Sequence, residues 1–304
     1  MNSVVVSNLS VKFGDFYAVK NINFSVKKGE IFGFLGANGA GKTTTIRVLC
    51  GLIAPSAGEV TVGGTVFKNG KSEHAIKNKV GYMSQKFTLY NDLTVEENLS
   101  FIASLRKLTK KEYHKRRDFL LSFTSFNKSM KSMVGELSGG TKQQVSLAAS
   151  LLHDPDIVFL DEPTAGVTPA SRARFWDLIQ ELSSLGKTVF VTTHYMDEAE
   201  QCERIALMSL GQIIALDSPT ALKSLYFPQG VYEFSPKTDI HYVNVERIKN
   251  EPEIDFFEPF GLRFHVALKS SADVNKFNQK LSDKFTIKHI TPTLEDVFIK
   301  AMEG

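Results

Sequence analysis

A glycine-rich loop near the N-terminus has the residue types and spacing of a phosphate-binding site. Residues 36–43 fit the pattern GxxxxGK(S/T) and lie between the apolar run Ile31–Leu35 and a predicted helix. Backbone N–H groups in such a loop surround a phosphate chain, the helix adds its positive end, and Lys42 supplies a point charge to the β- and γ-phosphates. Thr43 would place its hydroxyl on Mg²⁺, whereas a glycine-rich turn with an incidental lysine is the weaker alternative. The predicted nucleotide-binding residues of the loop are Gly36, Ala37, Asn38, Gly39, Ala40, Gly41, Lys42, Thr43 and Thr44.

Two acidic residues follow a second apolar run, Ile157–Leu160, and could act on bound phosphates. A carboxylate at the end of a buried strand is costly unless it meets a cation, and Mg²⁺ bound to phosphates is the natural one. Asp161 is therefore the predicted Mg²⁺-linked residue. The adjacent Glu162 can polarise a water for attack on the γ-phosphorus, as a general base does. Two acids that only cap a loop are the alternative, which weakens beside a phosphate-binding loop.

A third segment, Leu137–Gly140, places Ser138, Gly139 and Gly140 at the start of a predicted helix. Exposed N–H groups, a small hydroxyl and a helix dipole form an anion site there, although alone the pattern more often marks a helix cap. Leu-Ser-Gly-Gly between a phosphate-binding loop and an acidic strand resembles the signature of the ABC-type ATPases. The resemblance covers roughly residues 4–219.

The resemblance implies a nucleotide site shared by two chains. In such ATPases the phosphate loop of one domain and the Leu-Ser-Gly-Gly segment of a second close on the same ATP. A second ATPase subunit, identical or related, is thus the implied partner. By the same resemblance Phe13 stacks on adenine, Gln85 senses Mg²⁺ and the attacking water, and His194 contacts the γ-phosphate. Without it, Phe13 would be assigned to the core, Gln85 to the surface and His194 to a structural hydrogen bond.

The sequence departs from the family pattern at Thr168, where these ATPases usually carry an aspartate that couples the two ATP sites. A threonine cannot supply that charge. The departure implies slower hydrolysis, or a partner subunit with the intact element, while ATP binding survives. Thr141 and Gln144 replace the commoner glutamine and arginine near the signature, which matters less because the serine and glycines make the phosphate contact.

Three further segments resemble the stand-alone ATPase subunits of ABC-2 type exporters, the drug, lipid and polysaccharide efflux group. They are Gln85–Tyr90 with Leu93–Leu99, His194–Ala199 and Thr293–Phe298. The resemblance implies ATP and Mg²⁺ as cofactors, ATP hydrolysis coupled to transport, an integral membrane subunit as partner, and a position at the cytoplasmic face of the membrane. An apolar stretch would receive that membrane subunit or pack inside the helical region, and it consists of Phe87, Leu89, Tyr90 and Leu93.

Two other functions compete with an exporter subunit. A soluble ABC ATPase acting on ribosomes usually has two ATPase domains and a long charged linker, and one acting on DNA has long coiled coils. This chain has neither feature. A low-turnover ATP-binding regulatory subunit is the other alternative, which Thr168 keeps open.

Alternation and periodicity predict the elements that position these residues. Residues 4–26 alternate as antiparallel strands, and the apolar runs near 31–35, 157–160 and 189–191 give the βαβ order of a parallel sheet with the helix 170–185. A helical region is expected at about 86–153, with a charge run at 107–117 that faces solvent or, as the minority interpretation, lipid headgroups. Its expected buried stripe is Leu99, Ile102, Leu105, Phe119 and Leu120. The fold class is α/β, a P-loop ATPase domain with an antiparallel β subdomain and a helical signature subdomain.

A small α+β domain is expected after residue 219, where the pattern changes. Strands near 231–234, 254–257, 262–268 and 286–290, with helices near 241–249 and 272–284, give the ferredoxin-like order βαββαβ. A last helix, Leu294–Met302, follows the N-cap candidate Thr293 and has an apolar stripe that should dock on an apolar surface. The expected domains are therefore 1–220, which binds ATP, and 221–304, an accessory domain.

Composition limits the remaining alternatives. The 304 residues are 42% hydrophobic and 23% charged, as in ordinary globular chains. A formal net charge of +3 is too balanced to indicate nucleic acid as a partner. No apolar run approaches the roughly 20 residues of a membrane span and the N-terminus lacks a signal-peptide pattern, so neither spanning nor secretion is expected. Cys50 and Cys202 have no CxxC or histidine-rich neighbourhood, so neither a disulfide nor a zinc site is expected.

Overall fold

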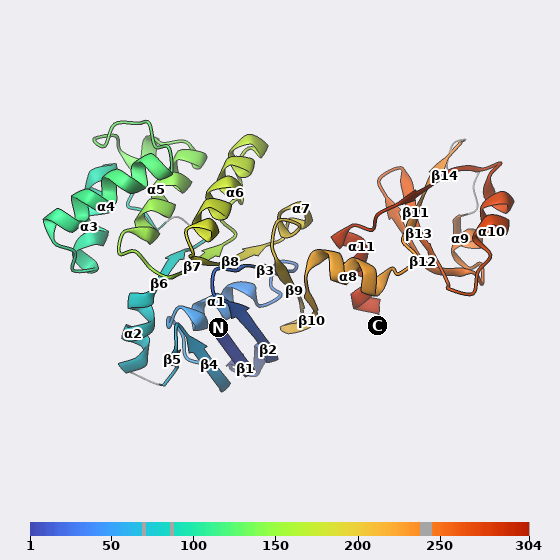
Figure 1. Ribbon diagram of the computed structural model, residues 1–304, viewed down its shortest axis with the longest axis horizontal. Coiled ribbons are helices and arrows are strands. Elements are labelled where there is room, and N and C mark those ends of the chain that lie inside the picture. The colour runs from blue at the N-terminus through green and yellow to red at the C-terminus, as the bar shows by residue number, and fades with distance from the viewer. Residues whose placement is uncertain (69–70, 86–87, 238–244, 304) are drawn as a thin grey trace. The chain divides into compact units, whose positions relative to one another are not determined.

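The computed structural model describes residues 1–68, 71–85, 88–237 and 245–303. These residues form two compact units, Met1–Ile214 and Ala215–Gly304 (Figure 1). The division lies inside a strand, and the boundary expected after residue 220 lies inside the next helix, Pro219–Tyr226. That helix packs on the last helix of the chain, which places both in the second unit.

A six-stranded sheet in the first unit positions the predicted site residues. Its strands are β3 (Ile31–Leu35), β6 (Val80–Met83), β7 (Ile157–Asp161), β8 (Thr188–Thr193), β9 (Arg204–Ser209) and β10 (Gln212–Asp217). The order is β10-β9-β3-β8-β7-β6, and the four strands β3, β6, β7 and β8 run parallel. Every residue of β3, β7 and β8 is buried, as the apolar runs predict. The loops after these four strands therefore leave the same edge of the sheet.

A four-stranded antiparallel sheet of the first unit contains the N-terminal strands and confirms the predicted start of the chain. It contains β1 (Asn2–Phe13), β2 (Phe16–Lys27), β4 (Ala57–Val62) and β5 (Thr65–Val66), in the order β2-β1-β4-β5. The β1–β2 hairpin turns at Gly14, whose φ of 58° lies in the left-handed region that glycine adopts readily. This tight turn brings Phe13 and Phe16 opposite each other.

Eight helices, one of them a 3₁₀ turn, complete the described part of the first unit. They are α1 (Lys42–Leu49), α2 (Lys71–Lys79), α3 (Val95–Leu105), α4 (Lys110–Phe123), η1 (Val134–Glu136), α5 (Gly139–Leu151), α6 (Pro169–Ser184) and α7 (Met196–Ala199). Capping boxes start α3 and α4, where Thr94 and Thr109 exchange hydrogen bonds with the glutamates three residues later. Both helices pack on α5, which packs on β6.

The buried stripe expected for the helical region is partly wrong. Leu99 and Leu120 are buried, and Ile102 is half-buried. Leu105 is 66% exposed and Phe119 is 48% exposed. Leu105 is the last residue of α3, and Phe119 lies one position before the buried Leu120, about 100° away around α4, so neither holds a covered position of its helix. The predicted start of this region at residue 86 lies outside the described residues.

The second unit shows the predicted order βαββαβ. Its core elements are β11 (Val231–Pro236), α9 (Val245–Lys249), β12 (Ile254–Phe260), β13 (Arg263–Leu268), α10 (Val274–Leu281) and β14 (Phe285–Ile290). The strands form one sheet in the order β12-β13-β11-β14, with antiparallel neighbours throughout. Aromatic residues from the sheet, including Phe234, Phe264 and Phe285, pack with Phe277 of α10. Of the helix expected at 241–249, residues 241–244 lie outside the described residues.

Two outer helices, α8 (Pro219–Tyr226) and α11 (Leu294–Glu303), pack on each other in this unit. Thr293 caps α11 as predicted, because its hydroxyl accepts from the N–H of Asp296. The Asp296 carboxylate accepts from Thr293 in return and lies 2.8 Å from Nδ1 of the buried His265 on β13. Leu294 and Val297 are fully buried, so the apolar stripe predicted for this helix does dock on an apolar surface.

Candidate functional site

The phosphate-binding loop lies between β3 and α1 and is shaped by close packing. A Cβ atom at Gly36 would lie 2.3 Å from the carbonyl oxygen of Met208, so only glycine fits there. Gly41 precedes α1 with a φ of 108°, which side chains rarely adopt. A Cβ at Gly41 would lie 2.4 Å from the Ala18 carbonyl oxygen. Neither position has room for a Cβ atom, and Gly41 also has a backbone conformation that favours glycine.

Replacing Gly41 with alanine should destabilise the protein by about 3 kcal/mol or more, because left-handed strain and an overpacked contact add together. Gly39→Ala is a matched control, since Gly39 has a φ of 84° but no atom within 4 Å of the place that a Cβ would take. Gly39→Ala should cost only about 1–2 kcal/mol, the left-handed strain. Thermal or urea unfolding of the two variants measures the difference. Equal losses would show that the contact with Ala18 has no energetic weight.

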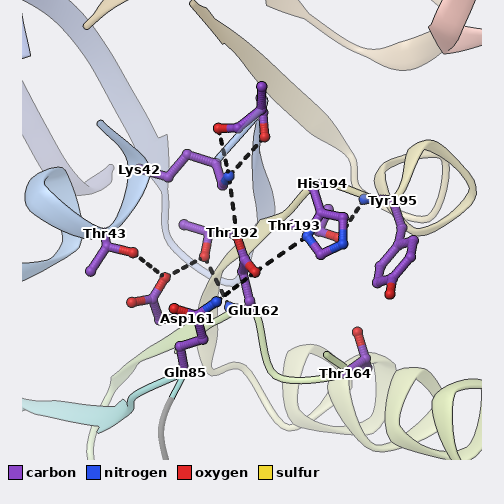
Figure 2. Close-up of polar contacts among 12 residues, drawn as sticks. Lys42, Thr43, Gln85, Asp161, Glu162, Thr164, Thr192, Thr193, His194 and Tyr195 are labelled. Atoms are coloured by element: carbon purple, nitrogen blue, oxygen red, sulfur yellow. Dashed lines mark hydrogen bonds and ion pairs between the residues drawn. The ribbon is translucent and has the colours of Figure 1, made fainter. Parts of the chain in front are cut away.

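Lys42 extends along the loop and is 4% exposed (Figure 2). Its Nζ donates to the carbonyl oxygens of Gly36 at 2.7 Å and Ala37 at 3.2 Å. The same ammonium lies 3.2 Å from Oε1 of Glu162, which is 6% exposed. The charge that would meet a phosphate is thus compensated inside the protein by a buried carboxylate.

Asp161 ends β7 and lies beside Thr43, as the sequence predicts. The Thr43 hydroxyl donates to Oδ1 of Asp161 at 3.1 Å, and the Thr192 hydroxyl donates to the same oxygen at 2.7 Å. Asp161 is 1% exposed, and burial raises the pKa of its carboxyl group. A hydroxyl and a carboxylate are the hard oxygen donors that Mg²⁺ prefers, so these residues fit that ion.

Glu162 is the point where three predicted site residues meet. Its Oε2 accepts from Nε2 of Gln85 at 2.9 Å and lies 3.2 Å from Nδ1 of His194, while Oε1 faces Lys42 (Figure 2). Its φ of 47° is unusual for a residue other than glycine. The backbone N–H of Glu162 donates to the carbonyl and hydroxyl oxygens of Thr192, which hold this conformation.

A cleft of about 390 Å³ opens above the phosphate loop. Phe13 and Phe16 lie at its rim and are 54% and 66% exposed, which leaves both rings free to stack on a planar ligand. The lining residues are Phe13, Phe16, Ala18, Asn38, Gly39, Gly41, Lys42, Thr43, Thr44, Gln85 and Glu162.

The signature segment does not lie in that cleft. Ser138 caps α5 by accepting from the N–H of Thr141, and Gly139 and Gly140 form the first turn. Ser138 and Gly140 line a different hollow, of about 210 Å³, together with Arg174 of α6. Within one chain, the structure therefore brings together the loop, Gln85, Asp161, Glu162 and His194, but not the signature.

Comparison with known proteins identifies the family. A family model described as "ABC transporter" matches residues 19–165. The linearmycin resistance ATP-binding protein LnrL of Bacillus subtilis is 40% identical over 218 residues, which cover 71% of this chain and 70% of that protein. This chain belongs to the ABC transporter ATP-binding proteins. The sequence-based family prediction is confirmed.

Other relatives of the ABC family extend the match. The probable multidrug ABC transporter ATP-binding protein YbhF of Escherichia coli is 44% identical over 73% of this chain, and the match spans only 38% of that relative. A Nod factor export ATP-binding protein I of Rhizobium is 32% identical over 99% of this chain and 97% of that protein.

Solved structures of ABC cassettes share the fold. The cbiO1 protein of Clostridium perfringens, part of a cbiONQ transporter complex, has a TM-score of 0.67 and 29% identity, and the match covers 73% of this chain and 90% of that protein. The cassette MJ0796, a dimer bound to ADP and Pi, has a TM-score of 0.65 and 28% identity, and the match covers 71% of this chain and 98% of that protein. The predicted α/β P-loop ATPase fold is confirmed.

Sequence reasoning does not identify three residues of this ABC site, Phe16, Tyr82 and Thr192. Phe16 could have been found as the residue opposite Phe13 in the hairpin. Thr192 precedes His194 by two residues, but its bonds to the acidic pair follow from the neighbouring positions of β7 and β8. The Tyr82 hydroxyl lies 3.5 Å from Oδ2 of Asp161, and burial raises its pKa, so it keeps its proton and can donate.

Thr168, the departure from the family pattern, has a structural role in this ABC protein. Its hydroxyl accepts from the N–H of Ser171 and caps α6, with Pro169 at the first helical position. Aspartate is an equally good N-cap. Threonine therefore caps α6, and the chain lacks only the negative charge that an aspartate would supply at this position.

Proposed function

We propose that this chain is the ATP-hydrolysing subunit of an ABC exporter, which acts through a separate membrane subunit. The observation that carries the proposal is the arrangement around Glu162. Its carboxylate meets Lys42, Gln85 and His194 at 2.9–3.2 Å, directly beside the Thr43–Asp161 pair. A positioned carboxylate, a phosphate-binding lysine and a metal-binding pair are the groups that phosphoryl transfer to water needs.

The proposed reaction begins when ATP enters the cleft and its phosphates replace Glu162 as the ion-pair partner of Lys42. Glu162 then loses its cationic partner and is free to accept a proton from a water that attacks the γ-phosphorus. Gln85 and His194, which already contact Glu162, would orient this water and the γ-phosphate. Mg²⁺, held through Thr43 and Asp161 with Gln85 nearby, would neutralise charge on the phosphates.

A second ATPase subunit, identical or related, completes the proposed site. The signature residues Ser138, Gly139 and Gly140 start α5, and Ser138 and Gly140 line a hollow separate from the chain's own phosphate loop. The N–H groups at this helix start could bind a phosphate of the ATP that is held by the phosphate loop of the second subunit. The dimeric state of the similar cassette MJ0796 supports this interpretation.

Exporter function is supported by the names of relatives, which include multidrug, linearmycin resistance and Nod factor export proteins, whereas an ABC-2 type membrane partner is proposed from the sequence resemblance. In the structure Leu89 is buried, whereas Tyr90 is 54% exposed and meets the 41% exposed Phe101 edge-on. Phe87 lies outside the described residues. Tyr90, five residues after Gln85, and Phe101 would receive the membrane subunit at the cytoplasmic face of the membrane. No helix among the described residues is long and apolar enough to cross a membrane.

Thr168 favours a second candidate, a regulatory ATP-binding subunit with low turnover. Thr168→Asp should preserve the cap of α6 and raise hydrolysis severalfold if the missing charge limits turnover. Thr168→Ala removes the cap and should cost about 1 kcal/mol of stability without raising hydrolysis. Steady-state ATPase rates of the two variants, measured with thermal unfolding, separate the roles. An unchanged rate in Thr168→Asp would show that the charge does not limit this protein.

The exporter proposal is tested by capturing the proteins that bind this chain when two ATPase subunits have closed on ATP. Glu162→Gln, loaded with ATP and Mg²⁺, should be pulled down from detergent-solubilised cells with a polytopic membrane protein in stoichiometric amount. Lys42→Met, whose ATP affinity should be about a hundredfold lower or more, is the control for nucleotide-dependent capture. Recovery of ribosomal or DNA-bound proteins with no membrane partner would reject the exporter and favour a soluble ABC ATPase.

A further inference from the structure

A buried carboxylate outside the proposed reaction connects two loops of the site. Glu198, in α7, is 0% exposed and accepts from two threonine hydroxyls. Thr164 donates to its Oε1, and Thr193 donates to its Oε2 at 2.6 Å. Thr164 follows Glu162 by two residues, and Thr193 immediately precedes His194. One carboxylate thus joins the loop of the proposed base to the loop of the histidine beside it.

On the histidine side, these bonds close a tight turn. The Thr193 oxygen also accepts from the N–H of Tyr195 at 3.0 Å, so the side chain of Thr193 spans His194 (Figure 2). A hydroxyl has one proton, and its donation to Glu198 turns the oxygen lone pairs toward Tyr195. Glu198 therefore fixes the direction of the hydroxyl that holds the backbone of His194.

On the glutamate side, Thr164 is 1% exposed and has the same partner. The loop between Glu162 and Thr164 is also held at Pro163, whose carbonyl oxygen accepts from the side-chain amide of Gln143 on α5. The N–H of Ala165 donates to the carbonyl oxygen of Glu162 at 3.1 Å. The proposed base thus sits in a loop whose far end is fixed by Glu198.

Arg172 of α6 supplies the positive charge that a buried carboxylate requires. Its Nε lies 3.5 Å from Oε1 of Glu198, and its guanidinium lies over the Tyr195 ring at 3.8 Å. Removing an ion from water is unfavourable unless the charge is compensated. The cluster of Glu198, Arg172, Thr164 and Thr193 therefore links α6, the acidic loop and the histidine loop.

We infer that Glu198 is a positioning residue for ATP hydrolysis, which keeps His194 and Glu162 at their 3.2 Å approach. Neither Glu198 nor its threonine partners line the nucleotide cleft, so the effect passes through the two loops. This inference rests on the proposed ATPase function. It assigns no role to Glu198 in nucleotide binding.

The test replaces Glu198 with glutamine, whose amide donates where the carboxylate accepts, so one threonine hydroxyl loses its acceptor. The hydrolysis rate at saturating ATP should fall about ten- to hundredfold, because His194 and Glu162 would be misplaced. The nucleotide Kd should stay within about twofold of the wild-type value. Asp197→Asn is the matched control, because the Asp197 carboxylate lies 3.6 Å from the same arginine but its side chain is 72% exposed. In a His194→Ala background, Glu198→Gln should cause a smaller loss than in the wild-type chain, because only the Glu162 loop is left to be misplaced.

Thr193→Val is a second variant, because it deletes the hydroxyl on the histidine side and preserves volume. It should lower the same rate with the same unchanged Kd. Wild-type rates in both variants, or losses that multiply with His194→Ala, would overturn the role of Glu198 and leave the ATPase function standing. A wild-type chain that binds ATP but does not hydrolyse it, even with its membrane partner, would overturn both.

Discussion

Replacing Glu162 with glutamine should lower ATP hydrolysis by about 10²–10⁴-fold, the contribution of a positioned general base. Glutamine keeps the size of the side chain and an oxygen that can accept from Gln85, but it cannot take a proton from water. It also removes the negative charge that faces Lys42 at 3.2 Å, so the lysine becomes free for phosphates. ATP affinity should therefore be retained or increased. Steady-state hydrolysis and equilibrium nucleotide binding measure the two effects separately.

Glu181→Gln is the control for this charge change, since Glu181 lies on α6 and its side chain is exposed. It should leave both rate and affinity unchanged. A Glu162→Gln variant that still hydrolyses ATP at the wild-type rate would show that another group activates the water. A variant that loses ATP binding would show that the Lys42–Glu162 contact supports the bound state and does not compete with it.

Replacing Lys42 with methionine should weaken ATP binding about a hundredfold or more, because charge-assisted bonds contribute about 1.5–3 kcal/mol each. Lys42 would make such bonds to two phosphates. Methionine keeps much of the length and the apolar character of the side chain, so the buried stem still fills its place. Titration of a fluorescent nucleotide measures the affinity. Lys110→Met, on the exposed side of α4, is the control and should bind ATP normally.

The same substitution should lower stability in the absence of nucleotide. Glu162 is 6% exposed, and removal of its cationic partner leaves a buried charge, which costs up to about 3–5 kcal/mol. Gln85 and His194 still contact the carboxylate and reduce that cost. The double variant Lys42→Met, Glu162→Gln should recover most of the loss, because no buried charge remains. If the double variant is as unstable as the sum of the single ones, the ion pair does not contribute to the folded state.

Secondary structure and fold class could be predicted largely from the sequence. The apolar runs before Gly36, Asp161 and His194 predict buried strands, and all three are fully buried. The βαββαβ order after residue 219 also follows from local pattern. The exposure of Leu105 and Phe119 could not be predicted in this way, because both residues fit a helical stripe. Which residues of the stripe are covered depends on how α3 and α4 pack on α5. Periodicity defines the faces of a helix, but packing partners decide which face is buried.

The residue types of the site could likewise be recognised in the sequence, since Lys42, Thr43, Asp161 and Glu162 lie in short segments whose chemistry is local. Their mutual contacts are not local. Glu162 meets Lys42 and His194 because β3, β7 and β8 are parallel neighbours whose following loops share one edge of the sheet. The Glu198 cluster could not be predicted for the same reason, because its threonines become partners only when strands distant in sequence pair side by side. The sequence specifies which groups are present, and the pairing of distant strands in the folded chain sets which of them form hydrogen bonds and ion pairs with one another.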